Sequence, residues 1–372
     1  MSNVFCVPCL LGVEGLVADE LKFNHFEKVQ AENGRVYFEG GMKDAARANI
    51  IMRCGERVLL RLASFRATTF DELFEGTKAI PWEAYVQTDS AFPVKGYSIG
   101  SQLHSVPNCQ KIIKKAAVSR LSQAYGINWF EETGVKYQIQ FSLMNDLCEI
   151  YLDTTGTPLY KRGYRTAAGE APLRETLAAS LVKIARYRGR EEMIDPMCGS
   201  GTIAIEAAMA AAKIMPGARR AFDAEAWAFY DTAFWQQLKE EAIAGESYEK
   251  LPITASDISA ECVQLTMDNA KRAGVADLMT IRRADALGVH YTGRKGVLIT
   301  NPPYGQRLLD VESAAELADD FGKALADTPD LKKYIISMDE QFEEHFGHKA
   351  TKRRKLYNGM LKCQLYMYYN AR

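Results

Sequence analysis

The sequence predicts an α/β protein with a doubly wound parallel sheet in its C-terminal half, preceded by two smaller α+β units. Three observations predict this fold. After residue 173, apolar strand-like segments alternate with helix-like segments, as in a parallel sheet covered by helices. Glycines and polar residues follow these strands directly, as at the ligand-binding edge of such a sheet. Residues 1–155 instead mix short strands with amphipathic helices and carry a hairpin turn signal at Asn33-Gly34.

The composition is that of an ordinary folded protein. The 372 residues include 46 basic and 47 acidic side chains, a net charge of −1, and 47 % are apolar. These values argue against a disordered or fibrous chain, and the length predicts two or three domains. No apolar stretch reaches the roughly 20 residues of a membrane-spanning helix, and the N-terminus lacks a secretory signal pattern. We therefore expect a cytoplasmic protein without a membrane partner.

The eight cysteines are scattered through apolar segments, which indicates reduced thiols rather than a disulfide framework. Cys6 and Cys9 form a close pair, but a structural zinc ion needs four ligands. No second close cysteine pair follows in the sequence. We therefore expect no metal.

The N-terminal half predicts two α+β domains, which we place at 1–58 and 59–155. The spacing of apolar residues predicts a β-α-β-β-α order for the domain at 1–58. For the domain at 59–155 it predicts alternating strands and helices that end in a pair of strands. The expected elements are strand 4–10, helix 13–22, strand 35–39 and helix 42–52, then strand 58–64, helix 71–79, strand 91–97, helix 108–125 and strands 136–143 and 147–153.

A connector separates these domains from the third. Residues 154–172 hold three glycines, two prolines and no long apolar period, so we place a linker at 156–170 and the third domain at 171–372. An aromatic-rich insertion at 215–251 is predicted to form a helix packed on this third domain. The other expected elements are helix 173–185, strand 192–195, helix 202–212, strand 253–257, helix 260–273, strands 279–283 and 296–300, helix 313–325, strand 333–337 and a final hairpin around Asn358-Gly359.

The first candidate site is the turn after strand 192–195, which reads Asp195-Pro196-Met197-Cys198-Gly199-Ser200-Gly201-Thr202. Its glycines allow a ligand to approach bare backbone. The turn also lies at the carboxyl end of a strand, where open α/β sheets bind ligands. A Walker phosphate loop needs a lysine after the last glycine, and none follows Gly201, which argues against an ATPase.

Two further strands end in carboxylates at the same sheet edge. Asp257 closes strand 253–257, where an acidic side chain accepts hydrogen bonds from the hydroxyls of a ribose. Asp285 follows strand 279–283, where it could accept a hydrogen bond from an adenine amino group. Each aspartate alone is more often a helix cap. In series with the glycine-rich turn, they predict an adenosine cradle.

The decisive motif is Asn301-Pro302-Pro303-Tyr304, at the end of the apolar strand 296–300. The two prolines have fixed φ angles and no N–H, so this corner presents carbonyl oxygens and the Asn301 side-chain oxygen as acceptors. An exocyclic amine that donates its two protons to such acceptors turns its lone pair outward, while Tyr304 offers a flat face to the ring. The motif therefore predicts alkylation of a planar amine.

In this order, residues 195–202, Asp257, Asp285 and 301–304 resemble the class I S-adenosylmethionine-dependent methyltransferases that methylate amines. Residues 161–165, 171–179 and 356–359 are similar to the corresponding segments of the THUMP-domain RNA methyltransferases, also labelled N6-adenine-specific DNA methylases. This resemblance covers nearly the whole chain. It implies a ferredoxin-like domain at 1–58, a THUMP RNA-binding domain at 59–155 and a Rossmann-like class I methyltransferase domain at 171–372.

The resemblance also implies the cofactor S-adenosylmethionine and the roles of individual residues. The implied cofactor-binding residues are Asp195, Pro196, Cys198, Gly199, Gly201, Thr202, Asp257, Ile258, Asp285, Ala286 and Asn301. The implied catalytic residues are Asn301, Pro302 and Tyr304, which position a base for direct methyl transfer without a metal or a covalent enzyme intermediate. Weaker candidates, near the methionine end of the cofactor, are Arg174, Glu175 and Thr176. Nothing near Cys198 in the sequence would activate it as a nucleophile.

Basic residues gather in three places and predict a phosphate-binding surface. Residues 90–130 contain five basic side chains and no acidic one, and further basic groups lie in the connector and at 352–355. The candidate RNA-binding residues are Lys95, Lys111, Lys114, Lys115, Arg120, Lys161, Arg162 and Arg165.

The resemblance to the THUMP-domain RNA methyltransferases also implies the reaction, which is methylation of guanine N2 in large-subunit ribosomal RNA.

Three alternatives stay open from the sequence. The amine-alkylating motif also serves N6-adenine methylation of RNA or DNA, although the 68 residues after Tyr304 leave little room for a region that reads DNA sequence. A protein glutamine amide is planar too, but the basic N-terminal half favours RNA. A non-catalytic RNA-binding protein is a third alternative, and the complete Asn301 motif and three aspartates argue against it.

Overall fold

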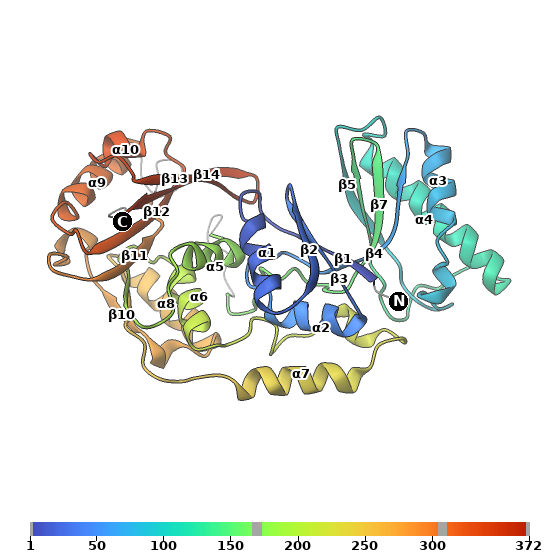
Figure 1. Cartoon of the computed structure of the whole chain (residues 1–372), viewed down its shortest axis with the longest axis horizontal. Helices are drawn as coiled ribbons and strands as arrows, with labels where there is room; N and C mark the ends of the chain where they lie inside the picture. The colour runs from blue at the N-terminus through green and yellow to red at the C-terminus, as the bar shows by residue number, and fades with distance from the viewer. Residues whose placement is uncertain (1–2, 166–172, 304–310, 370–372) are drawn as a thin grey trace.

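The computed structural model describes residues 3–165, 173–303 and 311–369. In Figure 1 the molecule is elongated, with the C-terminal half at one end and the two N-terminal units in the middle and at the other end. Within these residues, two seven-stranded sheets form the framework of the fold. No helix in the described part of the chain combines the length and apolar character that a bilayer crossing requires.

The first sheet contains all the N-terminal strands, in the order β2-β3-β1-β4-β7-β6-β5. The expected β-α-β-β-α unit and the second α+β unit are both present, but they share this sheet because β1 pairs antiparallel with β3 on one side and β4 on the other. The elements are β1 Asn3–Pro8, α1 Glu14–Phe23, β2 Glu27–Glu32, β3 Arg35–Gly40, α2 Met42–Ile51, β4 Leu59–Arg66, α3 Phe70–Lys78, β5 Val94–Ile99, α4 Val106–Tyr125, β6 Ile139–Met144 and β7 Leu147–Asp153.

The second sheet has the order β10-β9-β8-β11-β12-β14-β13, with β10 to β12 parallel and β14 antiparallel to both of its neighbours. The chain leaves β8 toward β9 on one side, and β11 lies on the other. Ligands bind at such a switch point, beyond the carboxyl ends of the strands. The elements are α5 Glu175–Ile184, β8 Glu192–Asp195, α6 Thr202–Ala211, α7 Thr232–Ala244, β9 Ile253–Asp257, α8 Ala260–Arg272, β10 Thr280–Arg283, β11 Gly296–Thr300, α9 Val311–Ala324, β12 Leu331–Ser337, α10 Phe342–His345, β13 Lys352–Asn358 and β14 Leu361–Tyr368.

Both faces of this sheet are buried. Along β11, Val297 and Ile299 join the hydrophobic core that also contains residues of α5, α6 and α8, whereas Leu298 joins the core formed with α9 and α10. Alternate side chains of a strand point to opposite faces. Helices therefore cover both faces, and the doubly wound fold is confirmed.

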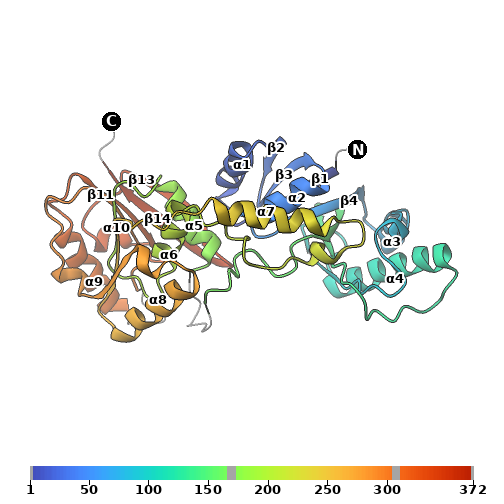
Figure 2. The same cartoon turned by 90° about the horizontal axis from the view of Figure 1, so that it is seen from below.

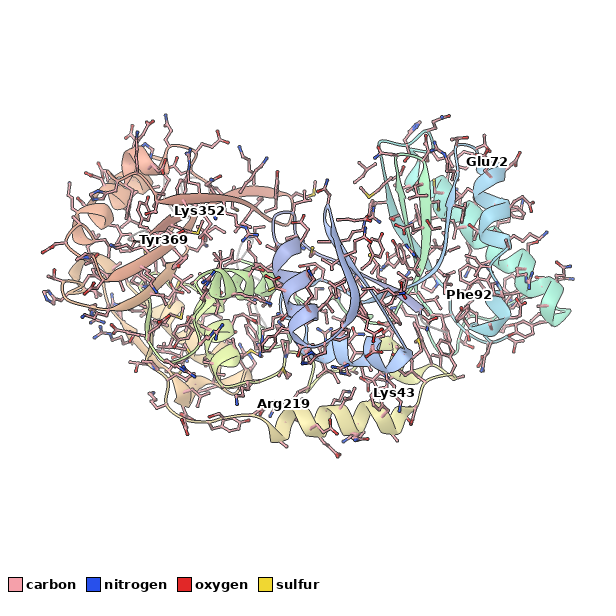
Figure 3. The ribbon with its side chains drawn as sticks, viewed as in Figure 1. Lys43, Glu72, Phe92, Arg219, Lys352 and Tyr369 are labelled. Carbon is pink, nitrogen blue, oxygen red and sulfur yellow. The ribbon has the colours of Figure 1, made fainter. Side chains whose placement is uncertain are left out.

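The insertion at 215–251 does contain a helix, α7, but the prediction that it packs on the third domain is wrong. It lies along α2 of the N-terminal half, as Figures 1 and 2 show. Lys43 of α2 lies over the Phe234 ring of α7 at 4.6 Å, on the side of the molecule where Figure 3 labels both Lys43 and Arg219. Trp227 stacks on Tyr137, with 5.1 Å between ring centroids. The aromatic side chains thus fasten the C-terminal half to both N-terminal units.

The connector is more ordered than its composition predicts. Thr154 and Thr155 are fully buried, and the Thr155 hydroxyl donates a hydrogen bond to Asn49 Oδ1 at 2.7 Å. Further along, Arg162 and Tyr164 are buried against Glu206 of α6. Residues 166–170 of the predicted linker lie outside the described residues.

Candidate functional site

The turn from β8 into α6 has a backbone that only glycine adopts readily. Gly199 and Gly201 have φ angles of +53° and +78°. A Cβ on Gly201 would lie 2.6 Å from the Thr266 methyl group, whereas a Cβ on Gly199 would meet no atom within 4 Å. Gly201 is thus required for packing, and the open side of Gly199 leaves bare backbone for a ligand.

Helix α8 holds this turn through two polar side chains that the sequence interpretation did not identify. The Thr266 hydroxyl donates to the Gly199 carbonyl oxygen at 2.8 Å, and Asn269 Nδ2 donates to the Ser200 carbonyl oxygen at 2.9 Å. Both side chains are buried. A threonine and an asparagine three residues apart on the buried face of an amphipathic helix were the available signal.

Asp195 lies at the base of the turn, 1 % exposed. Its Oδ1 accepts a hydrogen bond from the Thr300 hydroxyl at 2.8 Å. This bond joins the end of β8, where the glycine-rich turn begins, to the end of β11, where the segment beginning at Asn301, the Asn301 loop, leaves the sheet. The other oxygen, Oδ2, is buried without a hydrogen-bond partner among the described residues. Burial raises the pKa of Asp195 to about 7, and Asp257 adds a smaller effect in the same direction. A ligand that donates a hydrogen bond would satisfy Oδ2.

We expect the Asp195→Asn variant to be more stable than the wild type in the ligand-free protein. The buried carboxyl keeps its proton to a higher pH in the folded chain than in the unfolded chain, so the stability that it supports is lost as the pH rises toward 7. The stability gain of the variant should therefore grow by about 2 kcal/mol between pH 5 and pH 8, measured by urea unfolding. Asp277→Asn, at an exposed carboxylate, should show no such growth.

Asp257 and Asp285 lie at neighbouring strand ends, as predicted. Asp257 Oδ2 accepts the Gly199 N–H at 2.9 Å, so this carboxylate also fixes the glycine-rich turn. Asp285 is exposed, and its Oδ1 accepts the Leu287 N–H at 2.9 Å. Beside the two aspartates, Ile258 and Leu287 are exposed by 61 % and 37 %. Two carboxylates flanked by exposed apolar side chains suit a nucleoside; Leu287 was not predicted from the sequence.

The Asn301 loop leaves the sheet at the end of β11. Asn301 and Pro303 are half-buried, and Pro302 is buried. Pro302 and Pro303 border a cavity of about 310 Å³ together with Met197 of the glycine-rich turn. Tyr304, predicted to support the target base, lies outside the described residues.

Cys198 is packed inside the turn. Its thiol is buried, and Sγ lies 3.5 Å from Thr266 Oγ1. Burial raises the pKa of this thiol, with Asp195 adding to the effect. Because the thiolate is the nucleophilic form, these surroundings disfavour a nucleophilic role. Among the residues that the structure describes, no group of three or more His, Cys, Asp or Glu side chains could hold a metal ion.

The weaker candidates at the start of α5 contact other protein groups. Glu56 of the N-terminal half forms an ion pair with Arg174 at 3.0 Å and accepts the Thr176 hydroxyl hydrogen bond at 2.6 Å. Glu175 pairs with Arg165 at 2.9 Å, and burial raises the pKa of Glu175 to about 7. The Glu56 contacts connect the N-terminal half to the start of α5, and the Arg165 pair connects the connector to α5. They give no direct indication of a ligand.

Four of the eight candidate RNA-binding residues are engaged in ion pairs. Arg162 is a clear correction, because its side chain is 1 % exposed and its Nε lies 3.3 Å from Glu206 Oε1. Arg120 pairs with Glu83, Lys114 with Glu132, and Arg165 with Glu175. The exposed candidates are Lys95, Lys111, Lys115 and Lys161. At 352–355, Lys352, Arg353 and Lys355 are exposed, while Arg354 Nε donates to the Gly12 carbonyl oxygen at 3.0 Å.

Three family models match the chain in succession. The model described as the ferredoxin-like domain of RlmL matches residues 4–59, and the THUMP domain model matches residues 67–153. The model described as an RMKL-like methyltransferase domain matches residues 162–367, more than half of the chain.

Individual proteins are similar over nearly the whole chain. "Putative RNA methyltransferase YpsC" of Bacillus subtilis is 41 % identical over 97 % of this chain and 94 % of that protein. "Ribosomal RNA large subunit methyltransferase K/L" of Psychromonas ingrahamii is 35 % identical over 98 % of this chain, but the chain spans only 50 % of that protein. A crystal structure of SMU.472, "a putative methyltransferase complexed with SAH", is 36 % identical, with a TM-score of 0.92 over 100 % of this chain and 99 % of that one.

Proposed function

The chain belongs to the RMKL-like methyltransferase family, and we propose that it transfers a methyl group from S-adenosylmethionine to an exocyclic base amine of RNA. The observation that supports the proposal is the hydrogen bond between Thr300 and Asp195, which joins the ends of β11 and β8, where the Asn301 motif and the glycine-rich turn begin. The similar SMU.472 structure contains S-adenosylhomocysteine, the demethylated product of that cofactor.

The residues at the sheet edge fit this cofactor. The open side of Gly199 and the unpartnered Asp195 Oδ2 offer bare backbone and an acceptor to its polar groups. In this proposal Asp257 accepts hydrogen bonds from the ribose hydroxyls, and Asp285 accepts one from the adenine amine. When bound, S-adenosylmethionine supplies an electrophilic methyl group on a sulfonium.

The Asn301 loop performs the positioning step. The Asn301 side-chain oxygen and the Pro302 carbonyl oxygen would accept hydrogen bonds from the two amine N–H groups, which would orient the nitrogen lone pair for attack on the methyl carbon. With the cofactor bound, methyl transfer would form a C–N bond as the C–S bond breaks, and one amine proton would leave to solvent. Positioning and desolvation supply the rate in such a reaction, and no enzyme nucleophile takes part.

We propose guanine N2 of large-subunit ribosomal RNA as the acceptor. The THUMP match and the names of the K/L relatives, about twice as long as this chain, support ribosomal RNA. N6-adenine methylation in RNA or DNA is the second candidate, because the Asn301 loop also suits that amine. A protein glutamine amide and a role in RNA binding alone are the remaining alternatives.

The test compares the three candidate substrate polymers in parallel reactions. The purified protein is incubated with methyl-labelled S-adenosylmethionine and, separately, with RNA, DNA and protein from cells that lack it. We expect label in the RNA, concentrated in large-subunit ribosomal RNA. Label in DNA or protein alone would contradict RNA as the substrate. No label in any of the three fractions would contradict the proposal that the protein catalyses methyl transfer.

Exposed lysines of α4 are expected to contact RNA phosphates. The double variant Lys111→Ala and Lys115→Ala should weaken RNA binding and lower the slope of log K against log salt by about 1.5 to 2, since each lost phosphate contact removes close to one unit. Titrations at several salt concentrations measure this slope. The control pair is Lys295→Ala and Lys332→Ala, at the starts of β11 and β12, the edge opposite the site. An equal fall of the slope in both double variants would contradict a specific RNA-binding surface on α4.

A further inference from the structure

The cavity beside the Asn301 loop has the size and position of a nucleobase site. It measures about 310 Å³, near the lower end of the roughly 300–1,000 Å³ range of small-molecule sites. Met197, Pro302 and Pro303 form the wall toward the glycine-rich turn and the amine-binding loop. Much of the remaining wall is apolar, with Leu317 and Phe321 from α9 and Met338 from the end of β12. A flat ring could lie here with its amine toward the start of the Asn301 loop, which Pro302 and Pro303 bring to the wall.

One carboxylate in the wall, that of Asp339, is held in place by its neighbours. Asp339 Oδ1 accepts the Gln341 N–H at 2.8 Å, and Oδ2 lies 2.7 Å from His345 Nδ1. The backbone of Asp339 is fixed as well, because its N–H donates to Ser337 Oγ and its carbonyl oxygen accepts the Tyr366 hydroxyl hydrogen bond. Each carboxylate oxygen can accept more than one hydrogen bond. Asp339 is therefore a positioned acceptor at the edge of the cavity.

A fixed acceptor distinguishes the two candidate bases. In guanine the ring atom N1, adjacent to the amine-bearing carbon, carries a proton. In adenine the corresponding N1 carries a lone pair. An ionised carboxylate has acceptors only, so it pairs with guanine N1–H and is opposed by the adenine lone pair. Asp339 keeps its contacts with Gln341 and His345 whichever base is bound, so the discrimination comes from the adenine lone pair facing the carboxylate oxygen.

We propose that this cavity binds the target guanine and that Asp339 accepts the hydrogen bond of its N1–H, with His345 as the residue that positions the carboxylate. The inference rests on the proposed RNA methyltransferase function and deepens it, since it assigns the choice of base to a residue outside the Asn301 motif. Adenine is excluded by the same contact.

A base analogue tests the contact without removing the amine. An RNA transcript carries 2,6-diaminopurine in place of the methylated guanosine; this base keeps the 2-amine and has an unprotonated N1. The wild type should use it with a kcat/KM about 10- to 100-fold lower than for guanosine. In Asp339→Asn the amide can donate to N1, so the two substrates should differ by no more than about threefold. In His345→Ala, the ratio of kcat/KM for guanosine to kcat/KM for 2,6-diaminopurine should lie between the wild-type value and the Asp339→Asn value.

Glu344→Gln is the matched control, because this exposed carboxylate lies on α10 beside His345 and is not part of the cavity wall. Glu344→Gln removes one negative charge, as Asp339→Asn does, and should keep the guanosine-to-diaminopurine ratio of kcat/KM at the wild-type value. Unchanged thermal midpoints and S-adenosylhomocysteine affinities show that the variants are folded.

Two results would overturn the inference and leave RNA methylation intact: equal guanosine-to-diaminopurine ratios in Asp339→Asn and the wild type, or N6-methyladenosine as the wild-type product. A wild type that methylates no RNA would overturn the proposed function and this inference together. A guanosine-to-diaminopurine ratio that falls to near one in Asp339→Asn, but not in Glu344→Gln, supports both the proposed function and this inference.

Discussion

Replacement of Asn301 by alanine is expected to lower kcat for methyl transfer by about 10²- to 10³-fold and to leave the affinity for S-adenosylmethionine within about threefold of the wild type. The reason is that, in the proposed mechanism, the Asn301 side-chain oxygen accepts a hydrogen bond from the amine; Asn301 directly follows Thr300, which donates to Asp195. Alanine leaves the amine free to turn its lone pair away from the methyl carbon. Single-turnover kinetics with saturating RNA measure the rate of methyl transfer, and calorimetry measures the affinity for S-adenosylmethionine.

Asn128→Ala is the control for this variant, because Asn128 is an exposed asparagine in the N-terminal half, far along the sequence from the Asn301 loop. It should retain wild-type turnover. Near-normal turnover in Asn301→Ala would show that the loop does not hold the reacting amine.

The second large effect concerns stability. Arg162→Ala is expected to lower the free energy of unfolding by about 3–5 kcal/mol, because it leaves the Glu206 carboxylate buried without its charge partner. The two side chains are 1 % and 0 % exposed. Without Arg162, the Glu206 carboxylate keeps a single hydrogen bond among the described residues, from the Tyr164 hydroxyl at 3.2 Å. Urea unfolding, followed by circular dichroism, measures the loss.

Two comparisons separate this role from RNA binding. Lys323→Ala removes a cation from an exposed ion pair with Asp319 and should cost no more than about 1 kcal/mol. The folded fraction of Arg162→Ala should bind RNA with wild-type affinity. Weakened RNA binding in a variant of unchanged stability would contradict the buried position and support the phosphate-binding role that the sequence suggested.

Local patterns in the sequence predicted the methyltransferase half well. Strands Glu192–Asp195, Ile253–Asp257 and Gly296–Thr300 have the predicted bounds, because each is a short apolar run ended by a polar residue. The parallel order brings Asp195, Asp257 and the Asn301 loop to one edge. Alternating strands and helices are enough to predict that edge, and hence where a ligand binds.

Pairings between distant segments could not be predicted in this way. Residues 90–130 lack acidic side chains, yet Lys114 and Arg120 are paired with Glu132 and Glu83 from outside that run. The same holds for the insertion, where Trp227 stacks on Tyr137 across about 90 residues of sequence. A charge or aromatic pattern shows which side chains are available, and only the fold decides which partner each one meets.

The polar residues that support the site were missed for a related reason. Thr266 and Asn269 hold the glycine-rich turn from the buried face of α8. In the sequence they belong to an amphipathic helix with no motif of its own. Their role depends on α8 packing against the turn, which no local signal specifies.

The most direct test of the central claim is to identify the methylated nucleoside. RNA from cells that lack the protein is incubated with S-adenosylmethionine and either the wild type or Asn301→Ala, digested to nucleosides and analysed by mass spectrometry. We predict a gain of N2-methylguanosine in large-subunit ribosomal RNA that requires the wild type and is absent with Asn301→Ala. Methylation at a carbon or a hydroxyl oxygen, or the same product from Asn301→Ala, would contradict the claim that the Asn301 loop presents an amine to the methyl group.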